Sequence, residues 1–202
     1  MTKTAPEALD LSARSALLCA DLVERLPEFN HIQPSRVLFC LSRSRAAGLH
    51  GTYAHIVPLR FAGGVNEQTR HRGRLSETYR LPALRHGGEE ILYLIYLLVP
   101  RFLRLSAAQK LNTLIHELYH ISETCNGDIR RFAGRNFAHG SSRRAYNRLI
   151  AEFAERYRAS APDPALLAFL SATEDDWLAG RLHVTGLSVP RPRVRLVART
   201  RR

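Results

Sequence analysis

The sequence predicts an α+β fold, in which one helix is followed by several short strands and then by further helices. Three observations indicate this order. Apolar residues recur at helical spacing near the start, runs of branched and aromatic residues follow between glycines and prolines, and helical spacing returns after Pro100. This segregation of strands from helices favours a small, mostly antiparallel sheet over a parallel α/β sheet.

The first helix is expected over residues 6–26. Leu9, Ala13 and Leu17 are spaced as on one helix face, and Pro27 marks the end. Extended segments rich in branched and aromatic residues follow it. They are residues 36–42, 51–61, 74–82 and 89–99.

Several of these segments carry more specific expectations. Pro58 lacks an amide hydrogen, which places residues 51–61 at a sheet edge or gives them a bend. Residues 89–99 form either an edge that pairs with an extended substrate or a strand buried on both faces, because their apolar run is nearly continuous. Residues 60–74 are polar around Gly63–Gly64, which predicts an exposed loop or a hairpin tip.

The second half of the chain reads mainly as helices. Ser106, with Gln109 three residues later, forms a capping-box pattern that opens a helix through about residue 121. A second helix is expected from residue 141 or 142 to about 157, with Tyr146 on its apolar stripe. A further short helix is expected before the C-terminal arginines.

The charge of the chain is strongly positive and comes from arginine. The formal net charge is +12, and all of the 30 basic residues except Lys3 and Lys110 are arginine. One domain is expected over residues 1–186, and residues 187–202, with six arginines and no acid, form an Arg-rich C-terminal tail or arm. Guanidinium groups suit phosphate, which favours nucleic acid as a partner. An arginine-biased codon usage, with the charge spread over the surface, explains the same composition.

Cysteine usage and hydropathy favour a soluble, cytoplasmic protein without a membrane partner. Cys19, Cys40 and Cys125 are odd in number and widely spaced, which fits neither a disulfide framework nor a Cys-based zinc ribbon. The first residues include acids and do not resemble a secretory signal. The longest apolar run, residues 91–100, is about half of a membrane span.

The stretch "LNTLIHELYHISETCNGD" contains an H-E-x-x-H motif inside the helix that Ser106 opens. His116 and His120 are four residues apart, so both imidazoles lie on one helix side and can bind a single Zn²⁺. Glu117 can reach a metal-bound water without being a ligand. The alternative is a solvated helix face that carries two histidines and a glutamate.

A third zinc ligand is expected downstream, after Gly127 lets the chain turn back. His139 precedes Gly140 and the next helix, which favours it as the ligand, although a capping or surface role is the alternative. Asp128 is the other candidate ligand. If it is not a ligand, it is expected to bond a ligand imidazole or to pair with a neighbouring arginine, Arg130 or Arg131.

The segments "HELYH" and "HGSSRRAY" together resemble the SprT-like zincins, and the region 89–157 is most similar to uncharacterised metallopeptidases of phages and bacteria. The resemblance implies a zincin-like fold over the domain 1–186, one Zn²⁺ held by His116, His120 and His139, and Glu117 as the catalytic carboxylate. SprT-like proteins often act beside DNA. Many members carry a Cys-rich zinc ribbon or a zinc finger, for which this chain lacks the cysteines.

The expected activity is therefore zinc-dependent hydrolysis of peptide bonds in a protein or peptide substrate, with Glu117 as general base toward a zinc-activated water. Tyr146 or Arg143 is the candidate stabiliser of the oxyanion, and Tyr146 is alternatively a core aromatic. A different class of function is a basic nucleic-acid-binding protein with a structural or vestigial zinc site. A third is a protease that cleaves its own tail.

Overall fold

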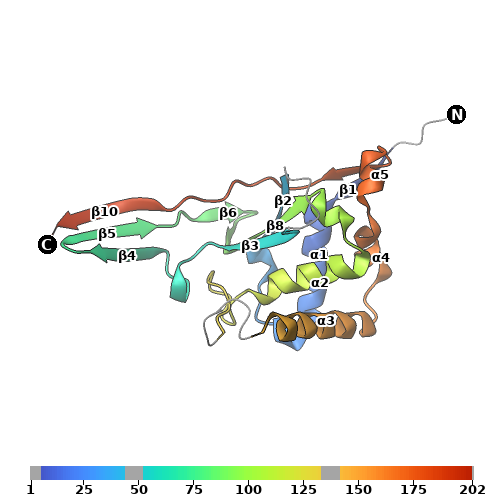
Figure 1. Ribbon diagram of the computed structural model, residues 1–202, viewed down its shortest axis with the longest axis horizontal. Helices are drawn as coiled ribbons and strands as arrows, with labels where there is room; N and C mark the ends of the chain where they lie inside the picture. The colour runs from blue at the N-terminus through green and yellow to red at the C-terminus, as the bar shows by residue number, and fades with distance from the viewer. Residues whose placement is uncertain (1–5, 44–51, 133–141, 202) are drawn as a thin grey trace.

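A computed structural model describes residues 6–43, 52–132 and 142–201 of the chain and confirms the α+β class. The body contains a sheet of order β2-β8-β3 with helices packed on one face, and a second sheet of order β10-β5-β4 projects from it as an arm (Figure 1). The helices are α1 Leu11–Arg25, α2 Ala107–Tyr119, α3 Arg143–Ala159, α4 Pro164–Leu167 and α5 Glu174–Leu178. The strands are β1 Glu7–Asp10, β2 Val37–Arg43, β3 Ala54–Pro58, β4 Glu67–Arg72, β5 Leu75–Arg80, β6 Leu84–His86, β7 Glu89–Ile91, β8 Tyr93–Val99, β9 Leu182–Thr185 and β10 Arg195–Arg201.

The first helix begins later than the sequence predicts and ends where expected. Asp10 is its N-cap, and its side chain accepts a hydrogen bond from the Ala13 amide at 2.9 Å. The residues before Asp10 form β1, which pairs in parallel with β9 near the other end of the chain. Helical spacing does not reveal this pairing, because the partner strand lies far away in the sequence.

The central sheet places β8 between two neighbours and leaves β3 at the edge. β2 pairs with β8 in parallel, and β3 pairs with β8 antiparallel. The hypothesis that residues 89–99 form a substrate-binding edge is therefore wrong, since the buried alternative holds for β8 and the segment is divided at Leu92. β3 carries Pro58 and is one of the two edge strands of this sheet, as its proline predicts.

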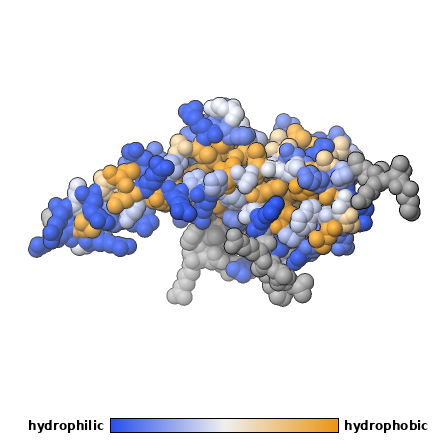
Figure 2. Space-filling view, turned by 90° about the horizontal axis from the view of Figure 1, so that it is seen from above, coloured by the Kyte–Doolittle hydropathy of each residue, from blue (hydrophilic) through white to orange (hydrophobic). Residues whose placement is uncertain are grey.

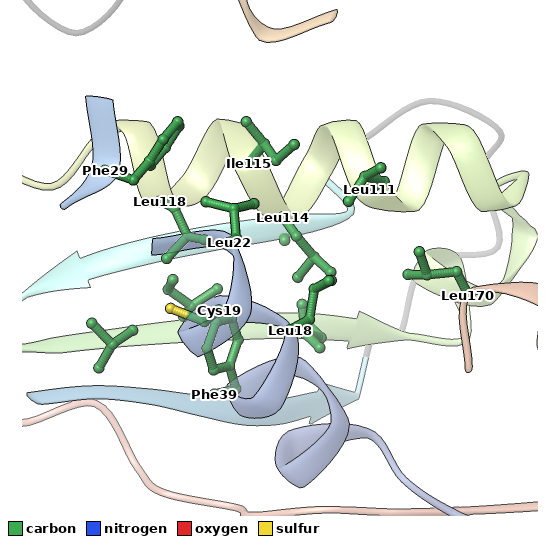
Figure 3. Packing of buried hydrophobic residues seen from close by; sticks show 14 of the residues in the cluster. Leu18, Cys19, Leu22, Phe29, Phe39, Leu111, Leu114, Ile115, Leu118 and Leu170 are labelled. Atoms are coloured by element: carbon green, nitrogen blue, oxygen red, sulfur yellow. The ribbon is translucent and has the colours of Figure 1, made fainter. Parts of the chain in front are cut away.

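The two faces of the central sheet contact different layers. Side chains such as Phe39 and Ile95 join the apolar residues of α1, α2 and α3 in the main core. Figure 3 shows Leu111, Leu114 and Leu118 of α2 above this face of the sheet. On the opposite face a smaller cluster forms, and Leu187 and Val189 after β9 pack against it. The Leu41 amide donates to the Leu187 carbonyl at 2.7 Å, which places this segment beside the outer edge of β2.

The helices after Pro100 follow their sequence signals closely. Ser106 and Gln109 make both bonds of the capping box at the start of α2. Ser142 caps α3 by accepting from the Ala145 amide at 3.2 Å. The expected stripe of α3 is buried, and α2 and α3 share the main core. No helix in the described ranges is both long and apolar enough to span a membrane.

The Arg-rich C-terminal segment pairs with another part of the chain. β4 and β5 form a hairpin turned at Gly73, where φ is 57°, which agrees with the expected hairpin tip in residues 60–74. β10 pairs antiparallel with β5 and completes the arm. The residues of β10 therefore extend an existing hairpin, and Figure 1 shows the C-terminus at the end of the arm.

The buried ammonium group of Lys110 joins α2 to the short helical segment after α4. Its Nζ donates to the carbonyl oxygens of Leu170 at 2.9 Å and Ala172 at 2.6 Å. Lys110 is only 1% exposed, and burial lowers its pKa to about 8. The neutral amine is therefore easier to bury than the charged one.

We expect the stability of the protein to rise between about pH 8 and about pH 10 because of Lys110. The unfolded chain binds more protons than the folded chain in this interval, so raising the pH favours folding by about 1–3 kcal/mol. Urea unfolding of the wild type and of Lys110→Met at both pH values measures the effect, because the variant has no ammonium to titrate. An equal pH response of the two proteins would contradict the prediction.

Candidate functional site

The H-E-x-x-H motif lies in the last turn of α2, where the helix runs beside the edge strand β3. Burial of Leu114, Ile115 and Leu118 in the main core fixes the rotation of the helix. His116 and His120 then lie one turn apart, with their ring centroids separated by 4.8 Å and their planes at 80°, an edge-to-face arrangement. Their Nε2 atoms point at each other across 3.1 Å.

This pair of imidazoles fits the requirement of a metal ion. Two nitrogen ligands at 2.0–2.1 Å from a tetrahedral ion lie roughly 3.3–3.4 Å apart, close to the separation of the Nε2 atoms of His116 and His120. Among residues 6–43, 52–132 and 142–201, no group of three or more His, Cys, Asp or Glu side chains is placed to hold a metal. The expected third ligand, His139, lies outside the described residues.

Glu117 is buried between α2 and β3. Its Oε2 accepts a hydrogen bond from the Ile56 amide at 2.9 Å, and the residue is 7% exposed. Burial raises the Glu117 pKa to about 7, and the bond from Ile56 opposes this shift only in part. A carboxyl group with a pKa near neutrality can both take and return a proton.

The Ile56 amide can bind Glu117 because β3 is an edge strand. The Tyr53 carbonyl accepts from the Leu98 amide at 2.9 Å, so Tyr53 directs its carbonyl toward the central strand. Backbone groups alternate along an antiparallel pair, so Ala54 and Ile56 direct theirs to the outer edge. The Ile56 amide therefore binds a carboxylate from α2, a contact that no local sequence pattern predicts.

Tyr146 of α3 contacts both imidazoles. Its ring lies 5.0 Å from that of His116 at 72° and 5.7 Å from that of His120 at 21°. The residue is 4% exposed, so it also belongs to the core, as the alternative interpretation predicts. Burial raises the Tyr146 pKa, and the nearby charge of Glu117 raises it further. The phenol therefore keeps its proton at neutral pH and can serve as a hydrogen-bond donor.

Asp128 is held by hydrogen bonds from both its own loop and the loop before β4. Arg131 donates to both carboxylate oxygens, at 2.9 and 3.2 Å, and the Gly63 amide donates to Oδ2 at 2.9 Å. Although burial alone raises the Asp128 pKa, the bonds from Arg131 and from the Gly63 and Ile129 amides lower it overall. The expected pairing with Arg131 is confirmed, whereas a role as metal ligand stays a prediction.

The two other candidate arginines, Arg130 and Arg143, lie in different surroundings. Arg130 bonds Glu123 at 2.8 Å and lies over the ring of Tyr119, with its guanidinium carbon 4.4 Å from the centroid. Arg143 lies in the first turn of α3 with an exposed side chain, one turn before Tyr146. Of the two candidate oxyanion stabilisers, Tyr146 therefore contacts the imidazole pair directly.

A cleft of about 460 Å³ opens beside Glu117 and His116, between β3, α2 and α3. Its other lining residues are Thr52, Tyr53, Ala54, Leu105, Gln109, Asn112, Thr113, Asn147 and Ile150. Asn112 and Thr113 precede His116 and Glu117 by one helical turn, so helical spacing could have found them. The residues of β3 depend on long-range pairing, and the sequence does not reveal them.

A larger cavity of about 1070 Å³ lies on the other side of β3, lined by residues that include His55, Tyr96, His183 and Arg191. The described lining contains no carboxylate. Burial and the charge of Arg191 lower the His55 pKa. The smaller cleft, by contrast, contains both a buried carboxylate and an imidazole of the converging pair.

Comparison with known proteins gives the family of the chain. Residues 14–153 match a family described as "Putative phage metallopeptidase", and the match runs from α1 to α3 through the H-E-x-x-H motif. No curated protein and no solved structure matches the chain. The family description implies a metal-dependent peptidase with a protein or peptide substrate, so the expected metallopeptidase class is confirmed. With more than half of its length matched, the chain belongs to the phage metallopeptidase family.

Proposed function

We propose that the protein is a zinc-dependent peptidase of the SprT-like zincin type, active in the cytoplasm on protein or peptide substrates. One observation carries the proposal: the imidazoles of His116 and His120 converge at 3.1 Å beside the buried carboxylate of Glu117. Hydrolysis of an unfolded protein such as reduced casein, lost on chelation and restored by Zn²⁺, is the direct test. Hydrolysis that persists after complete chelation would contradict the proposal.

The proposed ligands of the zinc ion are His116, His120 and His139. The described residues on both sides of the segment 133–141 support the third ligand. Phe132, just before it, lies 5.9 Å from Tyr146 in ring centroids, and the Ser142 carbonyl accepts from the Tyr146 amide at 3.0 Å. The chain therefore enters and leaves this segment beside the residue that packs on both imidazoles. Three imidazoles form a set of ligands that suits zinc.

In the proposed reaction, bound Zn²⁺ supplies a Lewis acid that polarises the carbonyl and lowers the pKa of water. Glu117 has one oxygen held by the Ile56 amide, which orients the carboxylate and leaves Oε1 to act on the water. Glu117 takes a proton from the attacking water and returns it to the leaving nitrogen. Burial of Glu117 raises its pKa, which makes the carboxylate a stronger base toward the water.

The proposed substrate lies extended along β3, in the cleft between β3 and α3. An edge strand can accept a further strand through its outward amides and carbonyls. Ala54 faces this edge and lines the cleft, two residues before Ile56. This arrangement brings a substrate backbone beside Glu117. In the proposal β3 has the role of substrate edge that the sequence suggested as one alternative for residues 89–99.

We expect Tyr146→Phe to lower kcat about 10- to 100-fold with little change in KM, because the phenol is proposed to donate to the oxyanion. The substitution keeps the ring that packs on His116 and His120. Steady-state kinetics of the zinc-loaded variant measure the effect, and Tyr157→Phe on the same helix is the matched control. If Tyr146→Phe retains full kcat, Tyr146 is only a core aromatic.

We also propose that the peptidase acts close to nucleic acid. The net charge of +12, carried by arginine, supports this part of the proposal. A basic nucleic-acid-binding protein with a structural or vestigial zinc site is the second candidate function. Glu117→Gln distinguishes the two candidates. A peptidase loses its hydrolytic activity in this variant, whereas a nucleic-acid-binding protein keeps its binding.

A further inference from the structure

The arm brings together two basic segments that are far apart in the sequence. β4 and β5 contribute residues 67–80, and β10 contributes residues 195–201. In the observed register Arg199 lies opposite Glu77, and Arg201 lies opposite Leu75. Figure 1 shows the resulting three-stranded sheet extending away from the helices, and Figure 2 shows hydrophilic residues at its end.

The two faces of the arm differ in chemistry, because alternate residues of a strand point to opposite sides. One face carries hydroxyl groups, with the Thr69 and Thr78 side chains 2.9 Å apart. The opposite face, named here the arginine face, carries the side chains of four arginines and one acid. They are Arg70, Arg72, Arg199, Arg201 and Glu77.

The single carboxylate of the arginine face is already engaged. Glu77 is 6% exposed, accepts two bonds from Arg199 at 2.6 and 3.0 Å, and accepts one from the Tyr79 hydroxyl at 2.7 Å. Across the described ranges, Arg70, Arg72 and Arg201 have exposed side chains and form no salt bridge. Arg70 also donates to the Gln68 side chain at 3.5 Å and lies over the Tyr79 ring, and neither contact neutralises its charge. The three guanidinium groups therefore offer exposed positive charge to a partner.

The spacing of these groups decides which partner fits. Arg70 and Arg199 lie on either side of Glu77 and form one row across the sheet. Arg72 and Arg201 lie on either side of Leu75 and form a second row, two residues or roughly 7 Å from the first. The strands that carry them are separated by β5, so the charges of one row lie roughly 10 Å apart. An extended acidic peptide carries its charges along a single chain. A duplex presents regularly repeated phosphates on two strands, which guanidinium groups bind in a bidentate manner.

We infer that the arginine face of the arm is a docking surface for double-stranded nucleic acid. The inference rests on the proposed function only in that this function places the peptidase near nucleic acid. The arm is roughly 20 Å long, and its outer strands lie roughly 10 Å apart, so its arginines can contact the phosphates on the two sides of a major groove about 12 Å wide. Backbone contacts through arginine predict strong salt dependence and little dependence on base sequence.

The test compares two variants of the full chain that lose the same charge. The arm variant carries Arg70→Gln, Arg72→Gln and Arg201→Gln, and it keeps Arg199, so Glu77 retains its partner. The control variant replaces three exposed arginines elsewhere on the protein. They are Arg14→Gln, Arg144→Gln and Arg148→Gln.

Binding is measured by fluorescence anisotropy of a labelled duplex of about 20 base pairs, from about 50 to 200 mM salt. We expect the arm variant to bind at least about tenfold more weakly and to reduce the slope of log K against log salt by about 2–3. We expect the control variant to stay within about threefold of the wild type.

Three results would overturn the inference. Equal weakening by the two variants would show that net charge alone attracts the duplex. Wild-type binding weaker than about 100 μM at low salt would exclude a docking surface. Competition by polyglutamate as effective as that by unlabelled duplex would assign the face to an acidic protein. None of these readings depends on hydrolysis, so a failed peptidase assay leaves the inference standing and a failed binding assay leaves the proposed peptidase standing.

Discussion

Replacing Glu117 by Gln is expected to reduce kcat/KM for peptide hydrolysis by a factor of about 10²–10⁴, the range attributed to a general acid–base group. The glutamine side chain still offers an oxygen to the Ile56 amide, so the contact between α2 and β3 is retained. It has no carboxylate to take the proton of the attacking water. The measurement is the initial rate on an unfolded protein substrate with zinc-loaded enzyme.

The control for this prediction is Glu123→Gln, which makes the same chemical change six residues away. Glu123 is exposed and pairs with Arg130 at 2.8 Å, away from the cleft lining. We expect this variant to keep its activity within about twofold, since exposed ion pairs contribute little. Glu117→Gln protein should also retain zinc and an unchanged circular dichroism spectrum. An activity that survives Glu117→Gln would exclude the proposed mechanism and favour the nucleic-acid-binding alternative.

The sequence predicts the parts of the site that depend on local signals. The capping box at Ser106, the spacing of His116 and His120, and the stripe of α3 that contains Tyr146 are all encoded within a few helical turns. Each of these features depends on helix geometry, in which residues four apart are neighbours. The identity of the helix that carries the chemistry, and of the helix that packs on it, could therefore be predicted.

The rest of the site depends on pairing between distant segments, which no local pattern specifies. Glu117 meets Ile56 across 61 residues, and β10 meets β5 across more than a hundred. Continuous apolar character is compatible with a buried β8, but it does not indicate which strands pair with it. Sequence patterns therefore leave residues 89–99 open as a substrate edge or a buried strand, and only the observed pairing decides for the buried strand. They also separate the Arg-rich tail from residues 60–74, although β10 and part of that segment form one arm.

We expect the purified protein to bind one zinc ion per chain and to lose it when His139 is replaced by Ala. A protein with two imidazoles in place of three should bind zinc more than about 100-fold more weakly, a larger loss than outer-shell substitutions cause. His116→Ala and His120→Ala should behave in the same way, because their Nε2 atoms converge. Elemental analysis after dialysis against a weak chelator gives the content of each variant.

Two further substitutions separate ligand loss from other effects. His183→Ala removes an exposed histidine of β9 and should leave the zinc content unchanged. Asp128→Ala removes the carboxylate that already binds Arg131 and the Gly63 amide, so it should destabilise its loop while one zinc per chain remains. Zinc lost with Asp128→Ala and retained with His139→Ala would reverse the assignment of the third ligand. Both variants losing zinc would mean that the loop around Asp128 positions the ligands. A carboxylate that accepts four hydrogen bonds from three residues has little capacity left to bind a metal directly.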